Sequence, residues 1–400
     1  RSTYRTHKGL LNIGIHSQIL VHHESNDGEF VRSCQSKFQA KLSPFNIPAR
    51  LDGLPLLLYP KRQASAFSLQ WLPDSIHSHI TQFNPDIIHL HWIGGGFLRI
   101  ETIAKLGKPV VWTLHDMWPL TGGCFYSQDC DRYTTACGHC PQLNSAKEND
   151  LSHWVWQRKM NAWKQVDLTI VTVSNWLAQC AKSSSLFKDR FIQVIPNALD
   201  LSVYKPFNPR DARRALNLPQ DKHLVLFGAL EATQDQRKGF HLLCPALKQL
   251  SQTAWQDKIE LVVFGSSAPA EPIDLGFKTH YLGHLHDDIA LVLAYSAASV
   301  TVVPSLQEAF GQTASEAMAC GTPVVAFDQT GVADIVDHKQ NGYLAQPLQI
   351  DDLARGISWV LEDSERYARL CQQARTKTEQ EFSLSQQAQR YFRLFTKILK

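Results

Sequence analysis

Two glutamates near the C-terminal end of the chain have the spacing and surroundings of a ligand-binding pair. They bound the run Glu308-Ala-Phe-Gly-Gln-Thr-Ala-Ser-Glu316. The apolar residues 299–303 predict a buried strand before the run, and residues 312–320 predict a helix that stops at Gly321. Glu308 is then on the loop before the helix, where its carboxylate can accept hydrogen bonds from sugar hydroxyls. Glu316 is about one turn into the helix, where it can chelate a ribose diol.

The start of this predicted helix favours an anion. Phe310 and Gly311 lie where backbone amides are free and the helix dipole is positive, and both features favour a diphosphate. Together with the two glutamates, this predicts a sugar-nucleotide site. The alternative is an ordinary strand-loop-helix unit with two solvated acids.

Two cations on another loop can neutralise such a diphosphate. The strand predicted at residues 224–227 runs into Gly228, and Arg237 and Lys238 follow just before Gly239. Cations at this place can offset the negative charge of a bound diphosphate. The alternative is that both are exposed cations at the start of a helix.

Polar and aromatic side chains also follow two predicted strands in the first half of the chain. His91 and Trp92 come after residues 87–90, and His115 and Asp116 come after residues 110–114. Doubly wound folds bind ligands at the carboxyl ends of parallel strands, so these four residues are candidate site residues. The alternative for each histidine is a core imidazole with satisfied hydrogen bonds.

Four of the nine cysteines lie close together in the sequence, in a loop rich in Gly and Tyr. These are Cys124, Cys130, Cys137 and Cys140. Four thiols that close with a C-x2-C pair are compatible with a structural zinc site. Disulfides and plain packing are the alternatives, because the first two spacings are not typical of zinc sites.

The elements that must position these residues alternate along the chain. Apolar runs separated by helical stretches predict βαβ units, parallel sheets and an α/β fold. The expected strands are residues 17–21, 87–90, 110–114, 168–173, 191–195, 224–227, 259–264, 280–282, 299–303 and 324–327. Helices are expected at residues 1–11 and at the C-terminal end. A chain of 400 residues is too long for one ordinary core, so we expect two domains.

Composition excludes several classes of protein. An apolar content of 44% and a charged content of 19% are typical of a globular protein, and a net charge of +3 is too small to indicate nucleic-acid binding. No apolar stretch has the length that spans a bilayer. With no signal peptide in view, a reduced, cytoplasmic protein is expected.

The run from Glu308 to Glu316 resembles the E-x7-E signature of the family 4 retaining glycosyltransferases, and the other motifs extend the resemblance over nearly the whole chain. The resemblance implies a GT-B fold, in which two Rossmann-like, doubly wound lobes face each other across a cleft. Within the family, the chain is most similar to bacterial enzymes of exopolysaccharide, colanic-acid or O-antigen biosynthesis.

The resemblance implies roles for the candidates in the second half. Glu308 faces the donor sugar and Glu316 the nucleotide ribose. The other residues expected at the donor are Phe310, Gly311, Gln312, Thr313, Gly228, Gly265 and Leu282. Lys238 fits the Lys-Gly position that assists departure of the diphosphate. Ala229 stands where the family has arginine, so Arg237 is expected to substitute from its neighbouring position.

In the first half, the resemblance implies that His115 contacts the outer hydroxyls of the donor sugar, with Asp116 orienting its imidazole. His91 and Trp92 are expected to border the acceptor pocket. A similar Cys-rich insert occurs in the polysaccharide-building relatives. Catalysis is expected to need no cofactor and no divalent metal.

The domain boundaries follow from the same resemblance. Residues 1–205 are expected to form the acceptor-side lobe, with the Cys-rich insert at residues 121–141, and residues 206–382 the nucleotide-sugar lobe. Residues 383–400 are expected to form a helix that crosses back to the first lobe. Family members usually begin with a strand and a Gly-rich loop, and neither precedes residue 1 here, so the first lobe is expected to be truncated.

These inferences predict a retaining hexosyltransferase. The expected donor is a UDP- or GDP-sugar, and the expected acceptor is a glycan or a polyisoprenoid-linked glycan in polysaccharide biosynthesis. Because such acceptors are common in the family, peripheral contact with the inner face of the cell membrane is also an expectation. The alternatives are a GT-B epimerase or phosphorylase and a non-catalytic, glycan-binding protein.

Overall fold

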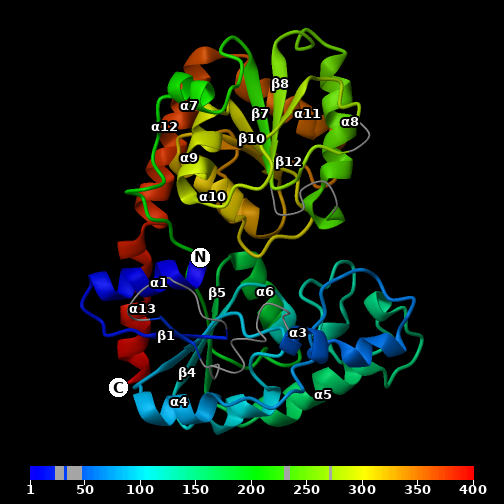
Figure 1. Cartoon of the computed structure of the whole chain (residues 1–400), viewed down its shortest axis with the longest axis vertical. Helices are drawn as coiled ribbons and strands as arrows, with labels where there is room; N and C mark the ends of the chain where they lie inside the picture. The colour runs from blue at the N-terminus through cyan, green and yellow to red at the C-terminus, as the bar shows by residue number, and fades with distance from the viewer. Residues whose placement is uncertain (23–30, 34–46, 229–234, 270–272) are drawn as a thin grey trace. The chain divides into compact units, whose positions relative to one another are not determined.

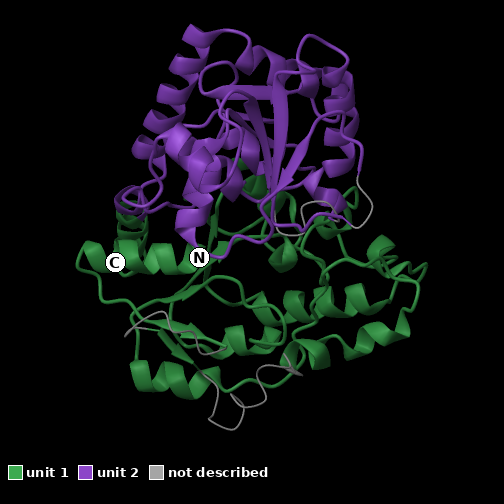
Figure 2. Ribbon diagram, turned by 45° about the horizontal axis from the view of Figure 1, so that its top comes forward, with its two compact units in different colours: residues 1–195, 388–400 green, residues 196–387 purple. Residues whose placement is uncertain are grey.

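The computed structural model describes residues 1–22, 31–33, 47–228, 235–269 and 273–400 (Figure 1). The chain forms two compact units (Figure 2). Unit 1 comprises residues 1–195 and 388–400, and unit 2 comprises residues 196–387. Within the described residues, no helix is long and apolar enough to cross a membrane.

The boundary between the units lies earlier than the predicted position at residues 205 and 206. The segment that begins at residue 196 makes its hydrogen bonds within unit 2: the Leu199 amide donates to the Phe382 carbonyl at 2.8 Å, and the Arg375 guanidinium donates to the Tyr204 carbonyl at 2.7 Å. The second boundary falls at residue 387 rather than 382, so the last helix begins in unit 2 and ends in unit 1.

Unit 1 is built on a parallel sheet with the strand order β3-β4-β5-β6, and β1 and β2 form a separate parallel pair. The strands are β1 (Ile19–Val21), β2 (Val31–Ser33), β3 (Ile88–Leu90), β4 (Val110–Leu114), β5 (Leu168–Thr172) and β6 (Ile192–Val194). The α-helices are α1 (Ser2–Asn12), α3 (Ile47–Asp52), α4 (Ile76–Phe83), α5 (Leu151–Trp163), α6 (Asn175–Ser183) and α13 (Leu384–Ile398). The 3-10 helices are η2 (Leu54–Leu58), η3 (Ile100–Lys105), η4 (Trp118–Leu120), η5 (Arg132–Thr134) and η6 (Pro141–Leu143).

The two faces of β4 pack against different helices, as the alternation of side chains along a strand requires. Val111 lies on one face in a buried cluster with Leu10 of α1 and Tyr391 of α13. Trp112 lies on the other face, where its ring meets that of Trp163 in α5 edge-on, with a centroid separation of 5.1 Å. Burial on both faces explains why β4 is apolar along most of its length.

Unit 2 is built on a six-stranded parallel sheet with the order β12-β11-β10-β7-β8-β9. The strands are β7 (His223–Gly228), β8 (Ile259–Phe264), β9 (Thr279–Tyr281), β10 (Val300–Val303), β11 (Val324–Phe327) and β12 (Gly342–Ala345). The α-helices are α7 (Pro209–Ala215), α8 (Phe240–Ser251), α9 (Asp288–Ala297), α10 (Gln312–Ala319), α11 (Ile350–Leu361) and α12 (Ser364–Glu381), and the 3-10 helices are η7 (Gln236–Lys238) and η8 (Thr330–Asp334). In Figure 1, α8 and α11 cover one face of the sheet, and α9, α10 and α12 lie on the other.

The chain reverses its direction across this sheet between β7 and β10. From β7 it proceeds through β8 to β9 on one side, and from β10 it proceeds through β11 to β12 on the other. This is the strand order of the Rossmann fold, and its ligands bind at the carboxyl ends of the two central strands. The sheet therefore brings the loops after β7 and β10 to one place.

Candidate functional site

The loops after β7 and β10 meet at the carboxylate of Glu308. The Lys238 ammonium donates a hydrogen bond to Glu308 Oε1, and the Ser305 hydroxyl donates to the same oxygen at 3.2 Å. Both members of the ion pair are largely buried, with side-chain exposures of 17% for Lys238 and 13% for Glu308. The predicted catalytic residues Lys238 and Glu308 are thus brought into direct contact.

Arg237 belongs to the same cluster but is held by other partners. Its guanidinium pairs with Asp235 at 2.9 Å and donates to the carbonyl of Gln307 at 2.9 Å, whereas it lies 3.8 Å from Glu308 Oε1. Arg237 is therefore fixed in orientation, while Lys238 is the cation nearest the glutamate. Ala229, where the family has arginine, lies outside the described residues.

The charges around Glu308 keep it ionised. Burial alone would raise the pKa of this carboxyl, but the positive charges of Lys238 and Arg237 and the hydrogen bond from Ser305 outweigh burial and lower it below its ordinary value. The site therefore presents a carboxylate together with two cations at neutral pH.

The loop after β11 supports Glu308 from a third direction. The Glu308 amide donates to the Thr330 hydroxyl at 3.2 Å, and the Gly331 amide donates to the Glu308 carbonyl at 2.8 Å. Thr330 has a φ of 59°, a left-handed conformation that is rare for a β-branched residue. Such strain persists only where the surroundings enforce it, so the backbone of Glu308 is held in a defined place.

The start of α10 lies directly after this loop and is not capped by a side chain. Gly311 is the N-cap residue and has a φ of 98°, which favours glycine. A Cβ atom here would also lie 2.7 Å from a methyl group of Val332. Without a capping side chain, the first amides of α10, at Gln312 and Thr313, are available to an anion. Phe310 is buried, with its ring edge-on to that of Phe382, and positions the turn.

Glu316 is more enclosed than the sequence suggests. Its side chain is 3% exposed, and its carboxylate accepts hydrogen bonds from the Tyr295 hydroxyl at 3.1 Å and from the Gln312 amide group at 3.3 Å. The Gln312 side chain thus lies between Glu316 and the start of the helix. A ribose diol that reached Glu316 would displace the weaker of these two contacts, the one from Gln312.

The remaining predicted donor residues lie at the ends of β7, β8 and β9. Gly228 ends β7, and a Cβ atom there would lie 2.0 Å from the ring of Phe264. Gly265 follows β8, and its amide donates to the Gly283 carbonyl at 2.7 Å, while the Leu282 amide donates to the Val263 carbonyl. These residues lie along the same edge of the sheet as Glu308, and their groups facing the edge are mainly backbone.

In unit 1, the strand ends of β3 and β4 bring two histidines together. His91 Nδ1 and His115 Nε2 are 2.9 Å apart, and the two rings are nearly parallel, at 19°. Burial lowers the pKa of both imidazoles, that of His115 to about 4, so both are neutral at physiological pH. One nitrogen of the pair must then donate and the other accept, which couples the tautomers of the two rings.

A chain of hydrogen bonds lies beside this pair. His89 Nε2 lies 2.7 Å from the Thr113 hydroxyl, and that hydroxyl lies 2.7 Å from the Tyr391 hydroxyl of α13. The ring of His89 also packs against that of His91, with a centroid separation of 4.2 Å. His89 was not among the predicted site residues, although it alternates with His91 along the chain and therefore shares its face of the sheet.

Asp116 does not orient His115, contrary to the prediction. The Asp116 carboxylate accepts a hydrogen bond from the Trp118 amide at 2.8 Å, and His91 is the partner of His115. Consecutive residues at the end of β4 point in different directions, which separates the two side chains. Burial raises the pKa of Asp116 to about 7, against the opposing effects of the Trp118 amide and the buried Lys159.

Trp92, by contrast, is exposed. Its side chain is 54% accessible, and its ring stacks on that of Phe125 with a centroid separation of 5.9 Å. An exposed, supported indole next to His91 is a surface on which a sugar ring can stack. The structure places Trp92 directly after β3, and its role at an acceptor stays a prediction.

The cysteine-rich loop is held by packing and hydrogen bonds. In the described part of the chain, no cysteine forms a disulfide, and no three His, Cys, Asp or Glu side chains are grouped as ligands that could hold a metal. The Gly122 amide donates to Cys137 Sγ at 3.1 Å, and burial raises the pKa of Cys124, Cys137 and Cys140, that of Cys137 to about 12. The neighbouring thiols of Cys130, Cys137 and Cys140 raise the pKa of Cys124 as well, so the four predicted cysteines lie near one another. Structural zinc at these four cysteines stays a prediction, with disulfides and plain packing as its alternatives.

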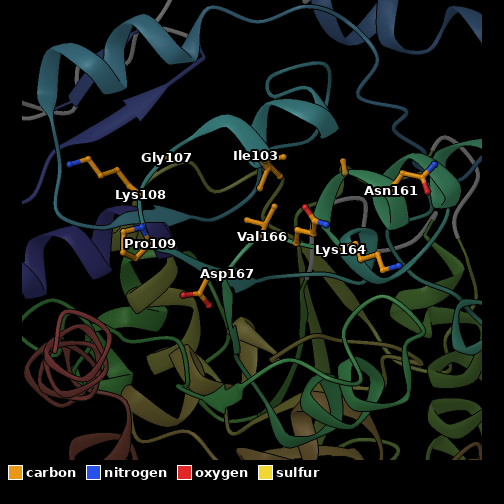
Figure 3. Close-up of a pocket in the computed structure, with 11 residues that line it drawn as sticks. Ile103, Gly107, Lys108, Pro109, Asn161, Lys164, Val166 and Asp167 are labelled. Atoms are coloured by element: carbon orange, nitrogen blue, oxygen red, sulfur yellow. The ribbon is translucent and has the colours of Figure 1, made fainter.

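A separate hollow of about 690 Å³ lies at the opposite end of the strands of unit 1 (Figure 3). Its lining includes Lys108 and Pro109 before β4 and Val166 and Asp167 before β5. Ligands of parallel sheets bind at the carboxyl ends of the strands, so this hollow is not the candidate site.

Comparison with known proteins agrees with the geometry. The model of the family described as Glycosyltransferase Family 4 matches residues 1–203, and that described as Glycosyl transferases group 1 matches residues 210–377. The D-inositol 3-phosphate glycosyltransferase of Arthrobacter sp. strain FB24 is 27% identical over 73% of this chain and 68% of its own length. The enzyme of the same name from Xylanimonas cellulosilytica is 35% identical over 46% of this chain, which spans only 46% of that relative.

Solved structures share the fold. Sucrose-phosphate synthase of Thermosynechococcus elongatus superposes with a TM-score of 0.69 at 20% identity, over 99% of this chain and 92% of that one. Anabaena HepE in complex with UDP-glucose superposes with a TM-score of 0.61 at 17% identity, over 98% and 94%. The predicted α/β, GT-B class is thereby confirmed. Because a family model matches more than half of the chain, this protein belongs to glycosyltransferase family 4.

Proposed function

We propose that the protein is a retaining hexosyltransferase that moves a hexose from a UDP-sugar to a hydroxyl group of a glycan or of a polyisoprenoid-linked glycan. The observation that carries the proposal is the contact between Lys238 and Glu308 at the reversal point of the unit 2 sheet, beside the uncapped start of α10. Cations and free amides suit a diphosphate, and a carboxylate suits sugar hydroxyls.

The ion pair has a direct role in donor binding. The Lys238 ammonium has three donors, so it can bind a phosphate oxygen while it keeps contact with Glu308. The diphosphate would then share Lys238 and leave the free lone pairs of Glu308 to accept hydrogen bonds from sugar hydroxyls. Arg237, already fixed by Asp235, would add positive charge without moving.

The transfer step follows from the same charges. The bond between the anomeric carbon and the diphosphate breaks, and a bond to the acceptor oxygen forms on the same face of the sugar. The proton of the acceptor hydroxyl passes to the departing phosphate oxygen. Lys238, Arg237 and the α10 amides stabilise the negative charge that develops on the leaving group, so this scheme needs no divalent metal.

The strand ends of unit 1 suit uncharged ligands. Neutral His91 and His115 can each donate or accept one further hydrogen bond, and Trp92 offers an apolar surface. We assign His115 to the outer hydroxyls of the donor sugar and His91 and Trp92 to the acceptor. Asp116 supports the turn that follows His115 rather than the imidazole itself.

The choice of uracil as base rests on likeness. Anabaena HepE was solved with UDP, with UDP and glucose, and with UDP-glucose. We also propose that the enzyme acts in polysaccharide biosynthesis, in peripheral contact with the inner face of the cell membrane. This part of the proposal is supported by the resemblance of the motifs to polysaccharide-building enzymes.

The test is calorimetric titration with UDP, GDP, UDP-glucose and GDP-mannose, followed by product analysis with glycan acceptors. We expect binding of the uridine compounds only, and an α-linked product from an α-linked donor. Glu308→Gln should bind UDP but lose transfer, and Glu379→Gln, a substitution of an exposed glutamate in α12, should change neither. Binding without transfer to any acceptor, or an epimerised nucleotide sugar as the product, would contradict the proposal.

A further inference from the structure

A short segment of unit 1 combines exposed leucines with cations. Leu51, Leu54, Leu57 and Leu58, which we call the leucine ridge, lie on α3 and η2 (α3 is labelled in Figure 1). Leu57 and Leu58 are 76% and 79% exposed, the highest values for large apolar side chains among the described residues, and Leu54 and Leu51 are 48% and 40% exposed. Single exposed leucines are ordinary, but four within eight residues form a patch that indicates an interaction.

The backbone beneath the ridge is anchored, so the exposure is not that of a frayed segment. Leu56, between the exposed leucines, points inward and is 6% exposed. The Asp52 carboxylate accepts a hydrogen bond from the Leu69 amide at 3.0 Å, and the Tyr59 hydroxyl accepts one from the Leu151 amide at the start of α5, at 3.1 Å. The leucines are therefore presented to solvent from a fixed platform.

The geometry of η2 aligns the ridge. Side chains three residues apart eclipse one another in a 3-10 helix, so Leu54 and Leu57 project from one side, and Leu58 lies next to Leu57. These side chains can therefore enter an apolar environment together without a large movement of the backbone.

The exposed charged residues within the segment 47–62 are all positive. Arg50, Lys61 and Arg62 are exposed, and among the described residues none of them forms an ion pair. Asp52 is the only acid between residues 47 and 62, and it is 1% exposed with one oxygen bonded to Ser68 and Leu69. The segment thus offers apolar side chains flanked by uncompensated cations.

We propose that the leucine ridge and its three cations dock on the surface of an anionic lipid bilayer. Apolar side chains flanked by Lys and Arg are the composition of interfacial segments, in which the apolar side enters the boundary of the acyl chains and the cations meet the headgroup phosphates. Docking of this kind rests on the membrane setting of the proposed function and names the surface that would make the contact. It does not depend on the donor site in unit 2, so vesicle binding and transfer can fail independently.

The test measures binding of the whole chain to sedimented vesicles, without nucleotide sugar. The vesicles are phosphatidylcholine alone or phosphatidylcholine mixed with phosphatidylglycerol. We expect binding to the mixed vesicles that weakens as salt is added, because salt screens the attraction between cations and headgroups. Leu57→Glu/Leu58→Glu should lower the partition coefficient at least about tenfold, since it removes apolar surface and adds repulsion, and Lys61→Glu/Arg62→Glu should also abolish binding.

A matched control separates the ridge from exposed apolar surface in general. Ile289 on α9 of unit 2 is 70% exposed, and Ile289→Glu should leave vesicle binding unchanged. Because all the substituted residues are exposed, melting temperatures and UDP affinity should stay at the values of the unsubstituted protein. Equal vesicle binding by the Leu57→Glu/Leu58→Glu variant overturns the proposal. A concentration-dependent dimer that this variant abolishes, without vesicle binding, would also overturn it and assign the ridge to a second copy of the chain.

Discussion

The carboxyl edges of the two parallel sheets both carry candidate site residues, but these residues are charged in unit 2 and uncharged in unit 1. At the edge of the unit 2 sheet, Lys238 and Arg237 lie beside Glu308 and lower the pKa of its carboxyl, so the three form a charged cluster. At the edge of the unit 1 sheet, His91 and His115 form an uncharged pair. The strand ends therefore determine only where the side chains lie. The side chains themselves determine whether an edge suits an anion or a neutral ligand with hydroxyl groups.

Removal of the Lys238 side chain should have the largest effect on catalysis. A small effect would mean that the charged edge of unit 2 does not act on the leaving group. We expect Lys238→Ala to lower kcat by about a hundred- to a thousandfold, the range for loss of one group that stabilises developing negative charge. The affinity for UDP should change less, because Arg237 and the α10 amides remain. Steady-state kinetics with calorimetric UDP affinities give both quantities, and Lys248→Ala, a change of an exposed lysine in α8, is the matched control.

A loss of folding could imitate this effect, because Lys238→Ala leaves Glu308 buried without its nearest cation. The double variant Lys238→Ala/Glu308→Gln removes that unpaired charge. We expect its melting temperature to recover while kcat stays low. Recovery of kcat together with stability would mean that Lys238 serves the fold and not the leaving group.

The two edges should respond to acid in different pH ranges. In unit 1, burial lowers the pKa of His89 to about 3 and that of His115 to about 4, from an ordinary value of 6.5. Between pH 6.5 and 4 the unfolded chain therefore binds protons that the folded chain does not, so the free energy of unfolding falls as the pH falls. The slope should be about 1.4 kcal/mol per pH unit for each histidine.

The charged edge of unit 2 should lose its contribution only at lower pH. The pKa of Glu308 lies below its ordinary value of 4.5, so its contribution is fully present above pH 4.5 and is lost as the pH falls through the folded-state pKa. Urea titrations across this range measure both effects, with His89→Phe expected to reduce the slope above pH 4.5 and Glu308→Gln the loss below it. An unchanged slope in His89→Phe would mean that this histidine is protonated in the folded protein.

Substitution of Glu316 tests whether the charged edge of unit 2 also binds the nucleoside. We expect Glu316→Gln to weaken UDP binding by about tenfold, since a hydrogen bond to a charged group is lost. Tyr295→Phe removes the hydroxyl that donates to this carboxylate, and it should lower the melting temperature while it changes UDP affinity little. Calorimetry and thermal unfolding separate these outcomes, and equal losses of affinity in both variants would assign Glu316 to the core.

For each sheet edge, the sequence predicts the strands and helices better than the side-chain contacts that form within that edge. All ten expected strands are present within two residues of their bounds, whereas β2 and β12 were not predicted. The short run of β12 begins with Gly342 and ends with Ala345, which have low strand preference. The motifs around Glu308 and Lys238 identified the two loops. Their contact across seventy positions could not be predicted, because it depends on β7 lying beside β10.

The contacts that the sequence did not predict have a common physical cause. Asp116 was expected to orient His115 because the two are neighbours in the chain, but strand geometry turns adjacent side chains apart and brings His91 from the next strand instead. The strained Thr330 and the chain from His89 to Tyr391 likewise depend on contacts between distant segments. Periodicity in the sequence carries no information about such contacts.

Substitution of His91, at the uncharged edge of unit 1, should have the smallest effect on catalysis. With both imidazoles uncharged, the tautomer of His115 is set by that of His91, because the facing nitrogens share one proton. His91→Leu removes this constraint, and we expect kcat/KM for the donor to fall by about tenfold, which corresponds to the loss of one hydrogen bond. Two-bond proton–nitrogen spectra of histidine-labelled protein should show His115 changing from one tautomer to a mixture. His91→Asn, whose amide group can stand where Nδ1 stands, should restore both the single tautomer and most of kcat/KM, and a Leu variant with unaltered His115 signals would mean that the pairing of the two rings is packing alone.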